Sequence, residues 1–403
     1  MRDLTIRGRC FLAAGAAAII CGIQVGEHDF VRIGLLALLV PTLSWLVMRR
    51  TEREVWVRRT VSAAQVEAGE TAEVHLEVGA GGDRRTATLL LEEDLPPALG
   101  DPQRFGLAPI APGEQRDARY LIRTAHRGRY PIGPLQVRVA DPTGMVDLHQ
   151  TISSTGSILV TPRTEPLPRV ALTGRWAGAG DDRTRELVGS GSPDVTVREY
   201  RVGDDLRRVH WPSSARAAEL MVRREEQQWQ SRCTLLLDNR RVAHRGYGLG
   251  SSMETAVSAA ASICRNLVDL DFEVRLVTAT DNTSSHGWRQ GAKAVDLPGQ
   301  LERLALLGMT RHEQLSTGWV DESQQGGMIM AVLGHLQTGD RELLAGLAAA
   351  GATAYAVVLD TATWDRAGST EPPATAWLRA HGWKATTLTR DGSLPTVWQE
   401  LAR

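Results

Sequence analysis

The sequence predicts a multi-domain fold that joins an N-terminal transmembrane α-hairpin, a β-sandwich and a doubly wound α/β domain. Three observations lead to this prediction. Two apolar runs lie within residues 1–50, and period-two alternation of apolar and polar residues follows in residues 51–162. From residue 233 to residue 403, apolar strands alternate with amphipathic helices. A chain of 403 residues is long enough for two or three domains, each with its own core.

The overall composition excludes several classes of protein. The 46 basic and 47 acidic side chains nearly cancel, which excludes a globally basic protein that binds nucleic acid. A hydrophobic content of 42% excludes a disordered chain. The 4 cysteines have no metal-ligand spacing and are too few for a disulfide framework. We therefore expect no nucleic-acid partner, no cysteine-bound metal and no disulfide scaffold.

The N-terminal segment contains two apolar runs of nearly membrane-spanning length, at residues 10–25 and 30–48. As a helix the first run is about 24 Å long, slightly short for a hydrocarbon core of about 30 Å, and the arginines before it can snorkel to extend it. The segment Gly26–Asp29 between the runs is short enough only for a hairpin. We therefore expect two transmembrane helices in residues 1–50, in contact with a lipid bilayer.

Basic residues set the expected orientation of this hairpin. They lie before the first run and after the second, at Arg2, Arg7, Arg9, Arg49, Arg50, Arg53, Arg58 and Arg59. By the positive-inside rule, the N-terminus and the bulk of the chain face the cytoplasm of a two-pass protein of the plasma (inner) membrane. A cleaved signal peptide is the alternative, but the small residues 14–16 lie inside the apolar run and a second run follows at once.

Residues 51–162 are expected to form the β-sandwich. Apolar and polar residues alternate in 72–78, 135–139 and 157–160, and turn sequences rich in Gly, Pro and Asp separate these segments. Many short strands at this spacing are typical of a small sandwich. Residues 163–193 are rich in Pro, Gly and charge and have no periodicity, which predicts an exposed linker.

Residues 233–403 predict a parallel sheet that helices cover on both faces. Four continuous apolar strands are expected, at 234–237, 274–277, 328–333 and 355–359. The helix between the first two strands has a buried face formed by Met253, Ala256, Val257, Ala260, Ile263, Cys264 and Leu267. Further helical segments at 303–307, 342–350 and 375–380 continue the alternation.

Residues 194–232 carry the densest pattern of charge, with arginines and carboxylates in balance. The structural interpretation is an ion-pair network at a domain junction, in which arginines pair with Glu199, Asp204 and Asp205. The catalytic interpretation assigns acid–base chemistry to Asp204, Asp205 and His210. Because the segment has no nearby nucleophile or set of metal ligands, we favour the structural interpretation.

The motif in this segment is REYRVGDDLRRVHWPSSAR. It resembles the signature of domain-of-unknown-function family 58 (DUF58), whose motif positions here are Arg198, Glu199, Tyr200, Gly203, Asp204, Asp205, Arg207, Trp211, Ala215 and Arg216. Upstream residues 127–134 and 141–144 are similar to the sandwich region of that family, and the hairpin matches its common architecture. The resemblance covers roughly residues 120–290 and implies family membership without implying a reaction.

The resemblance further implies that the α/β domain is similar to the von Willebrand factor type A domain. Such domains usually hold a divalent cation with a D-x-S-x-S motif at the end of the first strand, where hard oxygen ligands suit Mg²⁺. Here Asp238 is in place, but Arg240 and Val242 stand at the two serine positions. An arginine repels a cation and can pair with Asp238 in its place, so we expect a degenerate site with no metal and no cofactor.

A glycine-rich segment, Gly246–Gly250, precedes the first helix of the α/β domain. Its G-x-G-x-G spacing differs from the G-x-G-x-x-G of dinucleotide-binding loops, and it lacks a P-loop lysine. Ser251 and Glu254 form a capping box, which explains the start of the helix without a bound phosphate. We therefore expect no nucleotide at this loop.

Taken together, these features predict a membrane-anchored cytoplasmic adaptor or scaffold and not an enzyme. Members of the family that the chain resembles are often encoded beside MoxR-type AAA+ ATPases, which implies such an ATPase as the partner. The motif residues, together with His210, are then an interaction surface, and no catalytic residue is assigned. The alternative is a membrane-tethered metal- or phosphate-dependent hydrolase that uses Asp204, Asp205 and His210. Self-association of the α/β domain is a third interpretation.

Overall fold

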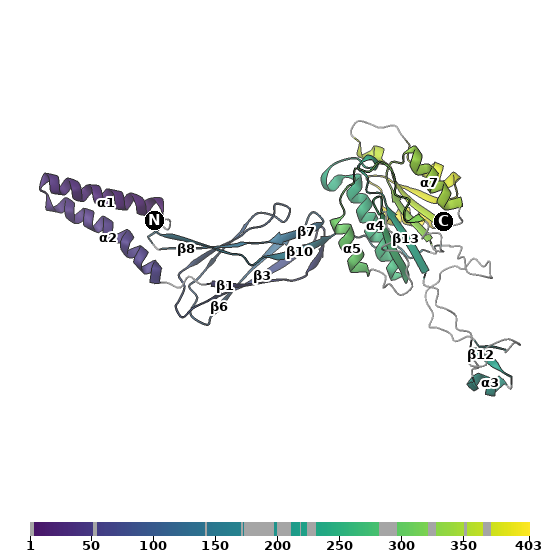
Figure 1. Cartoon of the computed structure of the whole chain (residues 1–403), viewed down its shortest axis with the longest axis horizontal. Helices are drawn as coiled ribbons and strands as arrows, with labels where there is room; N and C mark the ends of the chain where they lie inside the picture. Colours follow the sequence, from purple (N-terminus) through teal and green to yellow (C-terminus); the bar gives the residue numbers. More distant parts are fainter. Residues whose placement is uncertain are drawn as a thin grey trace. The chain divides into compact units, whose positions relative to one another are not determined.

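The computed structural model describes residues 4–50, 55–141, 143–170, 172, 197–199, 211–217, 219–223, 231–281, 296–320, 328–349, 353–365 and 372–403. The chain folds into two compact units, Met1–Pro162 and Arg163–Arg403 (Figure 1). The first unit holds two long helices and three β-sheets, and the second holds a parallel α/β sheet and a small two-stranded sheet.

The first unit begins with two helices, α1 (Ile6–Val25) and α2 (His28–Arg50). Thr5 caps α1, because its Oγ1 accepts a hydrogen bond from the Gly8 N–H, and Gly26 ends the helix with a left-handed φ of 78°. Both helices are long and apolar enough to cross a membrane. Helix α1 begins earlier than the apolar run predicted, because the cap and not the hydropathy decides where it starts.

Glycines allow α1 and α2 to pack closely. Gly8, Gly15 and Gly22 are the buried residues of α1. A Cβ atom added at Gly15 would lie 2.9 Å from the Gly34 carbonyl oxygen of α2, and one added at Gly34 would lie 2.7 Å from the Gly15 carbonyl oxygen. Small residues at such positions let two helix backbones approach each other. The helical hairpin predicted from the sequence is therefore confirmed as a pair of packed helices.

Strands from residues 55–161 form three sheets around one hydrophobic core. The first sheet has the order β1 (Val55–Val61), β3 (Thr71–Ala80) and β6 (Gln115–Arg123). The second has the order β5 (Gln103–Leu107), β4 (Leu89–Glu93), β8 (Leu135–Ala140) and β9 (Asp147–Ile152). The third has the order β2 (Gln65–Glu67), β10 (Gly156–Thr161) and β7 (Gly128–Ile132). The predicted alternation is confirmed in β3, where Ala72, Val74, Leu76 and Val78 are buried.

A turn of the β-region holds the start of the helical hairpin. The Thr5 N–H donates to the Met145 carbonyl oxygen at 2.9 Å, and Thr5 Oγ1 donates to the Gly144 carbonyl oxygen at 2.8 Å. In the last third of α2, Ser44 Oγ lies 3.1 Å from Thr143 Oγ1 of the same turn. Both helices of the hairpin are thus bonded to the same turn.

Asp141 orders this turn from inside. Its Oδ1 accepts a hydrogen bond from the Val146 N–H at 2.8 Å, and its Oδ2 accepts one from the Thr143 N–H at 3.2 Å. Burial acts to raise the pKa of the Asp141 carboxyl, but the hydrogen bonds from Thr143 and Val146 outweigh burial, so the pKa lies below its ordinary value. The turn therefore favours an ionised Asp141.

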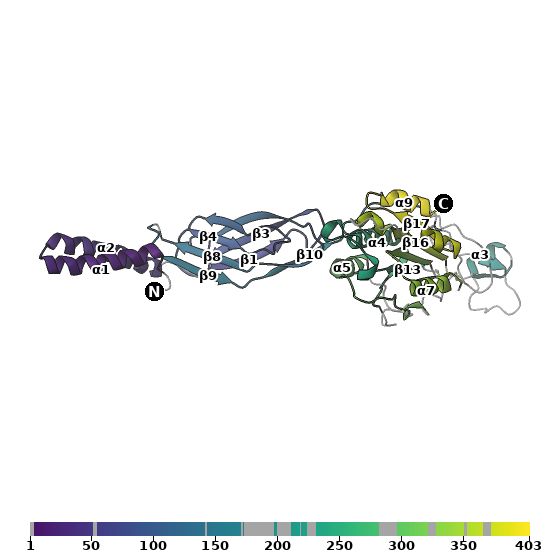
Figure 2. The same cartoon turned by 90° about the horizontal axis from the view of Figure 1, so that it is seen from above.

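The second unit contains a five-stranded parallel sheet with the order β14 (Phe272–Thr278), β13 (Ser231–Leu237), β15 (Met328–Leu333), β16 (Thr353–Leu359) and β17 (Lys384–Leu388). One face packs against α4 (Ser252–Asp269), α5 (Leu297–Leu306) and α9 (Leu394–Leu401). The other packs against α7 (Thr338–Ala349) and α8 (Thr375–Ala380). Figure 2 shows α7 and α9 on opposite sides of this sheet. Along β13, Leu235 and Leu237 point to the first core and Leu236 to the second. The predicted α/β parallel sheet is confirmed.

The helix predicted between the first two strands is α4, and every residue predicted for its buried face is buried. The next two predicted segments, 303–307 and 342–350, capture only the later parts of α5 and α7, because the Asp296 cap and the polar first turn of α7 begin these helices earlier. Strand β17 and helix α9 extend the alternation to the end of the chain.

Residues 163–170 lie against the α/β core, although the sequence predicted an exposed linker here. Leu167 packs on the core cluster, and Leu172 is only 2% exposed. Trp398 Nε1 also donates a hydrogen bond to the Pro168 carbonyl oxygen at 3.1 Å. Residues 163, 166 and 169 are exposed and the others of 163–170 are half-buried. A few apolar residues without periodicity give no signal of such contacts, so the sequence did not predict them. The rest of the predicted linker lies outside the described residues.

Candidate functional site

The carboxyl edge of the parallel sheet contains a topological switch point. After β13 the chain passes through α4 to β14 on one side of β13, whereas β15 lies on the other side. In open α/β sheets, ligands bind outside the carboxyl ends of the strands at such a point. The loops that follow β13 and β15 are therefore the candidate site.

A buried arginine fills the centre of this edge. Arg240, in the loop after β13, is fully buried. Its Nε and Nη2 donate to the two carboxylate oxygens of Asp238 at 2.9 and 2.8 Å. Its Nη1 and Nη2 donate to the two carboxylate oxygens of Asp340, each at 2.8 Å, and Nη1 donates to the Glu313 carbonyl oxygen at 2.6 Å. All five N–H groups of the guanidinium thus have an acceptor.

Backbone N–H groups complete the environment of the two carboxylates. Asp340 accepts hydrogen bonds from the N–H groups of Gln337 and Leu315, at 2.8 and 3.3 Å. Burial acts to lower the pKa of the Arg240 guanidinium, but its hydrogen bonds and ion pairs with Asp238 and Asp340 outweigh burial and raise the pKa above its ordinary value. Arg240 is therefore a permanent positive charge held between two carboxylates.

A neutral histidine supports the same loop. His244 Nε2 donates to the Asp238 carbonyl oxygen at 2.6 Å, so Nδ1 accepts the hydrogen bond from Ser252 Oγ at 3.1 Å. Ser252 Oγ in turn accepts a hydrogen bond from the Arg245 N–H at 2.8 Å. Burial lowers the pKa of His244 below its ordinary value. Because Ser252 is fully buried, this serine–histidine pair is closed to a substrate and acts as a structural contact.

The loop does not fit a cation at Asp238. Both of its carboxylate oxygens accept hydrogen bonds from Arg240, so Mg²⁺ would have to displace a buried guanidinium. Val242, in the short 3-10 helix η2 (Arg241–Ala243), offers only an aliphatic side chain. Among the residues that the structure describes, no group of three or more His, Cys, Asp or Glu side chains could hold a metal ion.

The charged motif predicted from the sequence is described only in part. Arg198 and Glu199 lie on β11 (Val197–Glu199), which pairs with β12 (Met221–Arg223) in an antiparallel sheet. Six of the predicted residues lie outside the described part of the chain, namely Tyr200, Gly203, Asp204, Asp205, Arg207 and His210.

The last part of the motif forms a short helix, α3 (Trp211–Ala217), which carries Trp211, Ala215 and Arg216. Ser214 Oγ accepts a hydrogen bond from the Met221 N–H at 2.8 Å, which fastens α3 to β12. The Trp211 side chain is 69% exposed, and Ala215 and Arg216 are also exposed. Trp211 and Arg216 are therefore both exposed side chains of one short helix, and exposed residues of these two types are frequent in protein contact surfaces.

The glycine-rich segment Gly246–Gly250 turns the chain into α4. Gly246 and Gly248 adopt left-handed φ values of 83° and 62°, which favour glycine. The predicted cap is present, because Ser251 Oγ accepts a hydrogen bond from the Glu254 N–H at 3.4 Å. The glycines therefore serve the turn that leads into this cap.

One protein-family description matches the part of the chain that holds the motif and the first strand of the sheet. Residues 196–296 match the family described as Protein of unknown function DUF58. The DUF58 match contains Asp238 and Arg240 but not Asp340. It confirms the family resemblance of the motif, and it assigns no reaction to this segment.

Several solved structures are similar to the chain over about a quarter to a third of its length. The CARDB domain of a Pyrococcus furiosus protein is 15% identical and covers 27% of this chain and 87% of its own, with a TM-score of 0.21. The alkylpurine DNA glycosylase AlkC of Pseudomonas fluorescens is 14% identical and covers 33% and 39%, with a TM-score of 0.20. The sporulation control protein Spo0M of Bacillus subtilis is 12% identical and covers 27% and 49%, with a TM-score of 0.17. Such scores carry no argument about function. No curated protein matches the chain.

Sequence reasoning did not find Asp340, the third member of the Arg240 network. An acidic residue in the first turn of a helix is ordinary, so Asp340 in α7 has no distinctive local signal. One feature of the sequence nevertheless indicates that Arg240 has a second carboxylate partner. An arginine placed directly after a buried strand needs more acceptors than Asp238 alone provides, and the loop after a neighbouring parallel strand is where a second carboxylate can reach it.

Proposed function

We propose that this protein is a membrane-anchored adaptor or scaffold whose cytoplasmic part recognises another protein. In this proposal residues 51–162 are a β-sandwich and the α/β domain is a degenerate relative of the von Willebrand factor type A domain. The observation that carries it is the state of Asp238, whose carboxylate is fully used by Arg240. A domain that has replaced its cation by an arginine retains a recognition surface but lacks a Lewis acid at that position.

The anchor in this proposal is the α1–α2 hairpin in the plasma (inner) membrane. Large apolar side chains cover its outer surface and are exposed in the isolated chain, among them Ile20, Ile23, Val25, Ile33, Leu35, Leu36, Leu39 and Leu43. Such a surface needs lipid or protein to cover it. The arginines at both open ends of the hairpin favour a cytoplasmic N-terminus and a cytoplasmic bulk.

The docking surface in this proposal is the DUF58 motif, and the partner is a MoxR-type AAA+ ATPase. Exposed Trp211 and Arg216 on α3 support a contact role, because tryptophan and arginine carry much of the binding energy in protein interfaces. Asp204 and Arg207 add the charged groups that select a partner and its orientation.

Crosslinking of the full chain in native membranes, followed by affinity purification, tests this function. We expect the wild type to capture the ATPase and the folded Asp204→Ala/Arg207→Ala and Trp211→Ala variants to lose it. A matched control is Glu92→Ala/Arg104→Ala, which removes an exposed ion pair of the β-region with an N–O distance of 3.0 Å and should keep the capture. Equal capture by all variants, or no ATPase with any of them, contradicts the proposal.

The hydrolase alternative has its own outcome in the same preparation. If the purified chain hydrolyses a phosphate ester and Asp205→Asn abolishes the turnover, the motif is a catalytic site and the adaptor proposal is wrong. If no turnover is found and the capture is lost in the motif variants, the alternative has no support.

A further inference from the structure

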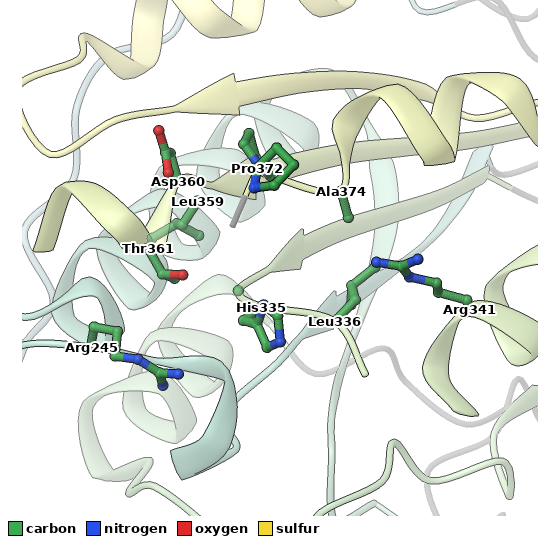
Figure 3. Close-up of a pocket in the computed structure, with 11 residues that line it drawn as sticks. Arg245, His335, Leu336, Arg341, Leu359, Asp360, Thr361, Pro372 and Ala374 are labelled. Atoms are coloured by element: carbon green, nitrogen blue, oxygen red, sulfur yellow. The ribbon is translucent and has the colours of Figure 1, made fainter. Parts of the chain in front are cut away.

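A depression at the carboxyl edge of the sheet is lined by residues other than Asp238, Arg240 and Asp340 (Figure 3). It is a shallow hollow that opens to solvent, and the space in it that a water-sized sphere can reach is about 30 Å³. The polar side chains that line it come from the loops after β13, β15 and β16 and from α7, and they are Arg245, His335, Arg341, Asp360 and Thr361. Loops from both sides of the topological switch point therefore meet around this depression.

Arg341, in the first turn of α7, is held in place without an ion pair. Its Nε is buried and has no hydrogen-bond partner among the described residues. Its guanidinium carbon lies over the Trp377 ring, 5.7 Å from the ring centroid. In Figure 3 the guanidinium extends from α7 toward Leu336. The Trp377 ring thus orients the Arg341 guanidinium. Within the described structure, the side-chain N–H groups of this guanidinium donate no hydrogen bond that would occupy them.

A second guanidinium reaches the depression from the loop after β13. Nη1 of the exposed Arg245 donates to the carbonyl oxygens of Val242 and His244, each at 3.0 Å. These bonds fix the side chain through one nitrogen, and no described residue bonds the other two. His335 lies between Arg245 and Arg341 in Figure 3. The depression therefore presents donors from two directions.

Asp360 adds selectivity on the side of β16. It is a carboxylate among the lining residues and forms no ion pair with either arginine in the described structure. A carboxylate at this place repels a bare multivalent anion but accepts hydrogen bonds from hydroxyl groups. The lining as a whole therefore suits a ligand that carries an oxyanion at one end and hydroxyl groups at the other.

We propose that this depression binds a small phosphate ester, with its phosphate group on Arg245 and Arg341 and its hydroxyl groups toward Asp360. Planar guanidinium forks match the geometry of phosphate oxygens. The site uses none of the motif residues, so it does not rest on the identity of the protein partner.

Isothermal titration of the full chain in detergent tests the proposal, with ribose 5-phosphate, inorganic phosphate, ribose and a glutamate-rich peptide as probes. We expect saturable binding of ribose 5-phosphate, weaker binding of inorganic phosphate and no binding of ribose. Arg341→Gln should weaken the binding of ribose 5-phosphate about 10-fold or more, because it removes charge-assisted hydrogen bonds. Arg245→Gln should do the same, and because Arg245 is exposed this second variant should fold normally.

The matched control is Arg403→Gln, an exposed arginine that does not line the depression. It should bind ribose 5-phosphate as the wild type does. The proposal is overturned if no phosphate-bearing probe binds, or if the Arg245 and Arg341 variants bind as the control does. It is also overturned if only a glutamate-rich peptide binds, because the depression would then be a contact for a protein.

Discussion

Arg240 Nη2 lies 2.8 Å from Asp340 Oδ2, although the two residues are 100 positions apart in the sequence. The bond joins the loop after β13 to the first turn of α7, which follows β15. The two sides of the topological switch point are therefore fastened to each other by one side chain. Since Asp238, Arg240 and Asp340 are all buried, loss of the guanidinium would leave two carboxylates without a counter-charge.

The first prediction concerns this network. Arg240→Leu should lower the free energy of unfolding by about 3–5 kcal/mol, the usual cost of removing one partner from a buried ion pair. Arg241→Leu is the matched control, because Arg241 is exposed and its bond to Thr310 is made by the backbone N–H. The control should change stability by less than about 0.5 kcal/mol. Chemical denaturation of the full chain measures both, and equal effects would show that the network is not a stabilising element.

The second prediction concerns the pH dependence that His244 creates. Its pKa in the folded chain lies below the ordinary 6.5, so the stability it contributes is present above pH 6.5 and is lost as the pH falls through the lower folded pKa. His244→Gln should remove this loss, whereas His312→Gln, at an exposed histidine, should keep it. The measurement is thermal unfolding at pH values from about 7.5 to about 5, which bracket the ordinary pKa of histidine. An unchanged profile in His244→Gln would contradict the assignment.

The third prediction concerns Asp141 in the turn that holds the hairpin. The pKa of this carboxyl lies below its ordinary 3.8, so its contribution is complete above pH 3.8 and is lost as the pH falls through the folded pKa. Asp141→Asn should destabilise the chain at neutral pH by about 1.5–3 kcal/mol, the range for hydrogen bonds to a charged group. The difference from the wild type should shrink on acidification. Asp101→Asn, at an exposed position, should show no difference at either pH.

The fourth prediction concerns the helical hairpin. Gly15→Leu should lower the melting temperature of the chain in detergent, because a side chain there meets the Gly34 carbonyl oxygen within 2.9 Å at its first carbon. The expected cost is about 1–3 kcal/mol, as for other overpacked contacts. Ala14→Leu adds the same kind of side chain at the adjacent exposed position and should leave the melting temperature unchanged. A similar loss in both variants would mean that α1 does not pack on α2 through Gly15.

Local periodicity predicted those elements whose burial follows a simple rule. The alternation that ends in Leu76 and Val78 identified β3, and the apolar face around Ile263 identified α4. In both cases each residue's environment follows from its position along one strand or one helix. A single sequence is sufficient for such elements.

Burial of charge explains much of what local patterns did not predict. Strand β1 contains Arg59, whose side chain is only 3% exposed because it pairs with the fully buried Glu93 of β4. In a sequence, an arginine normally indicates an exposed position. Arg59 therefore interrupts the alternation of apolar and polar residues that would identify β1. Asp340 in the candidate site is likewise a charged residue that is buried because it has an ion-pair partner. Arg240 could be expected to pair with Asp238, its near neighbour, but a partner 100 residues away depends on the complete fold.

Metal binding by the purified full chain tests our central proposal most directly, namely that Arg240 occupies the carboxylate of Asp238 in place of a cation. Equilibrium dialysis against Mn²⁺ should find no stoichiometric metal on the wild type. The Arg240→Ser/Val242→Ser variant, which creates the D-x-S-x-S spacing after β13, should gain a bound Mn²⁺. Stoichiometric Mn²⁺ on the wild type that disappears in Asp238→Ala would contradict the account, because the site would then hold a cation in spite of Arg240.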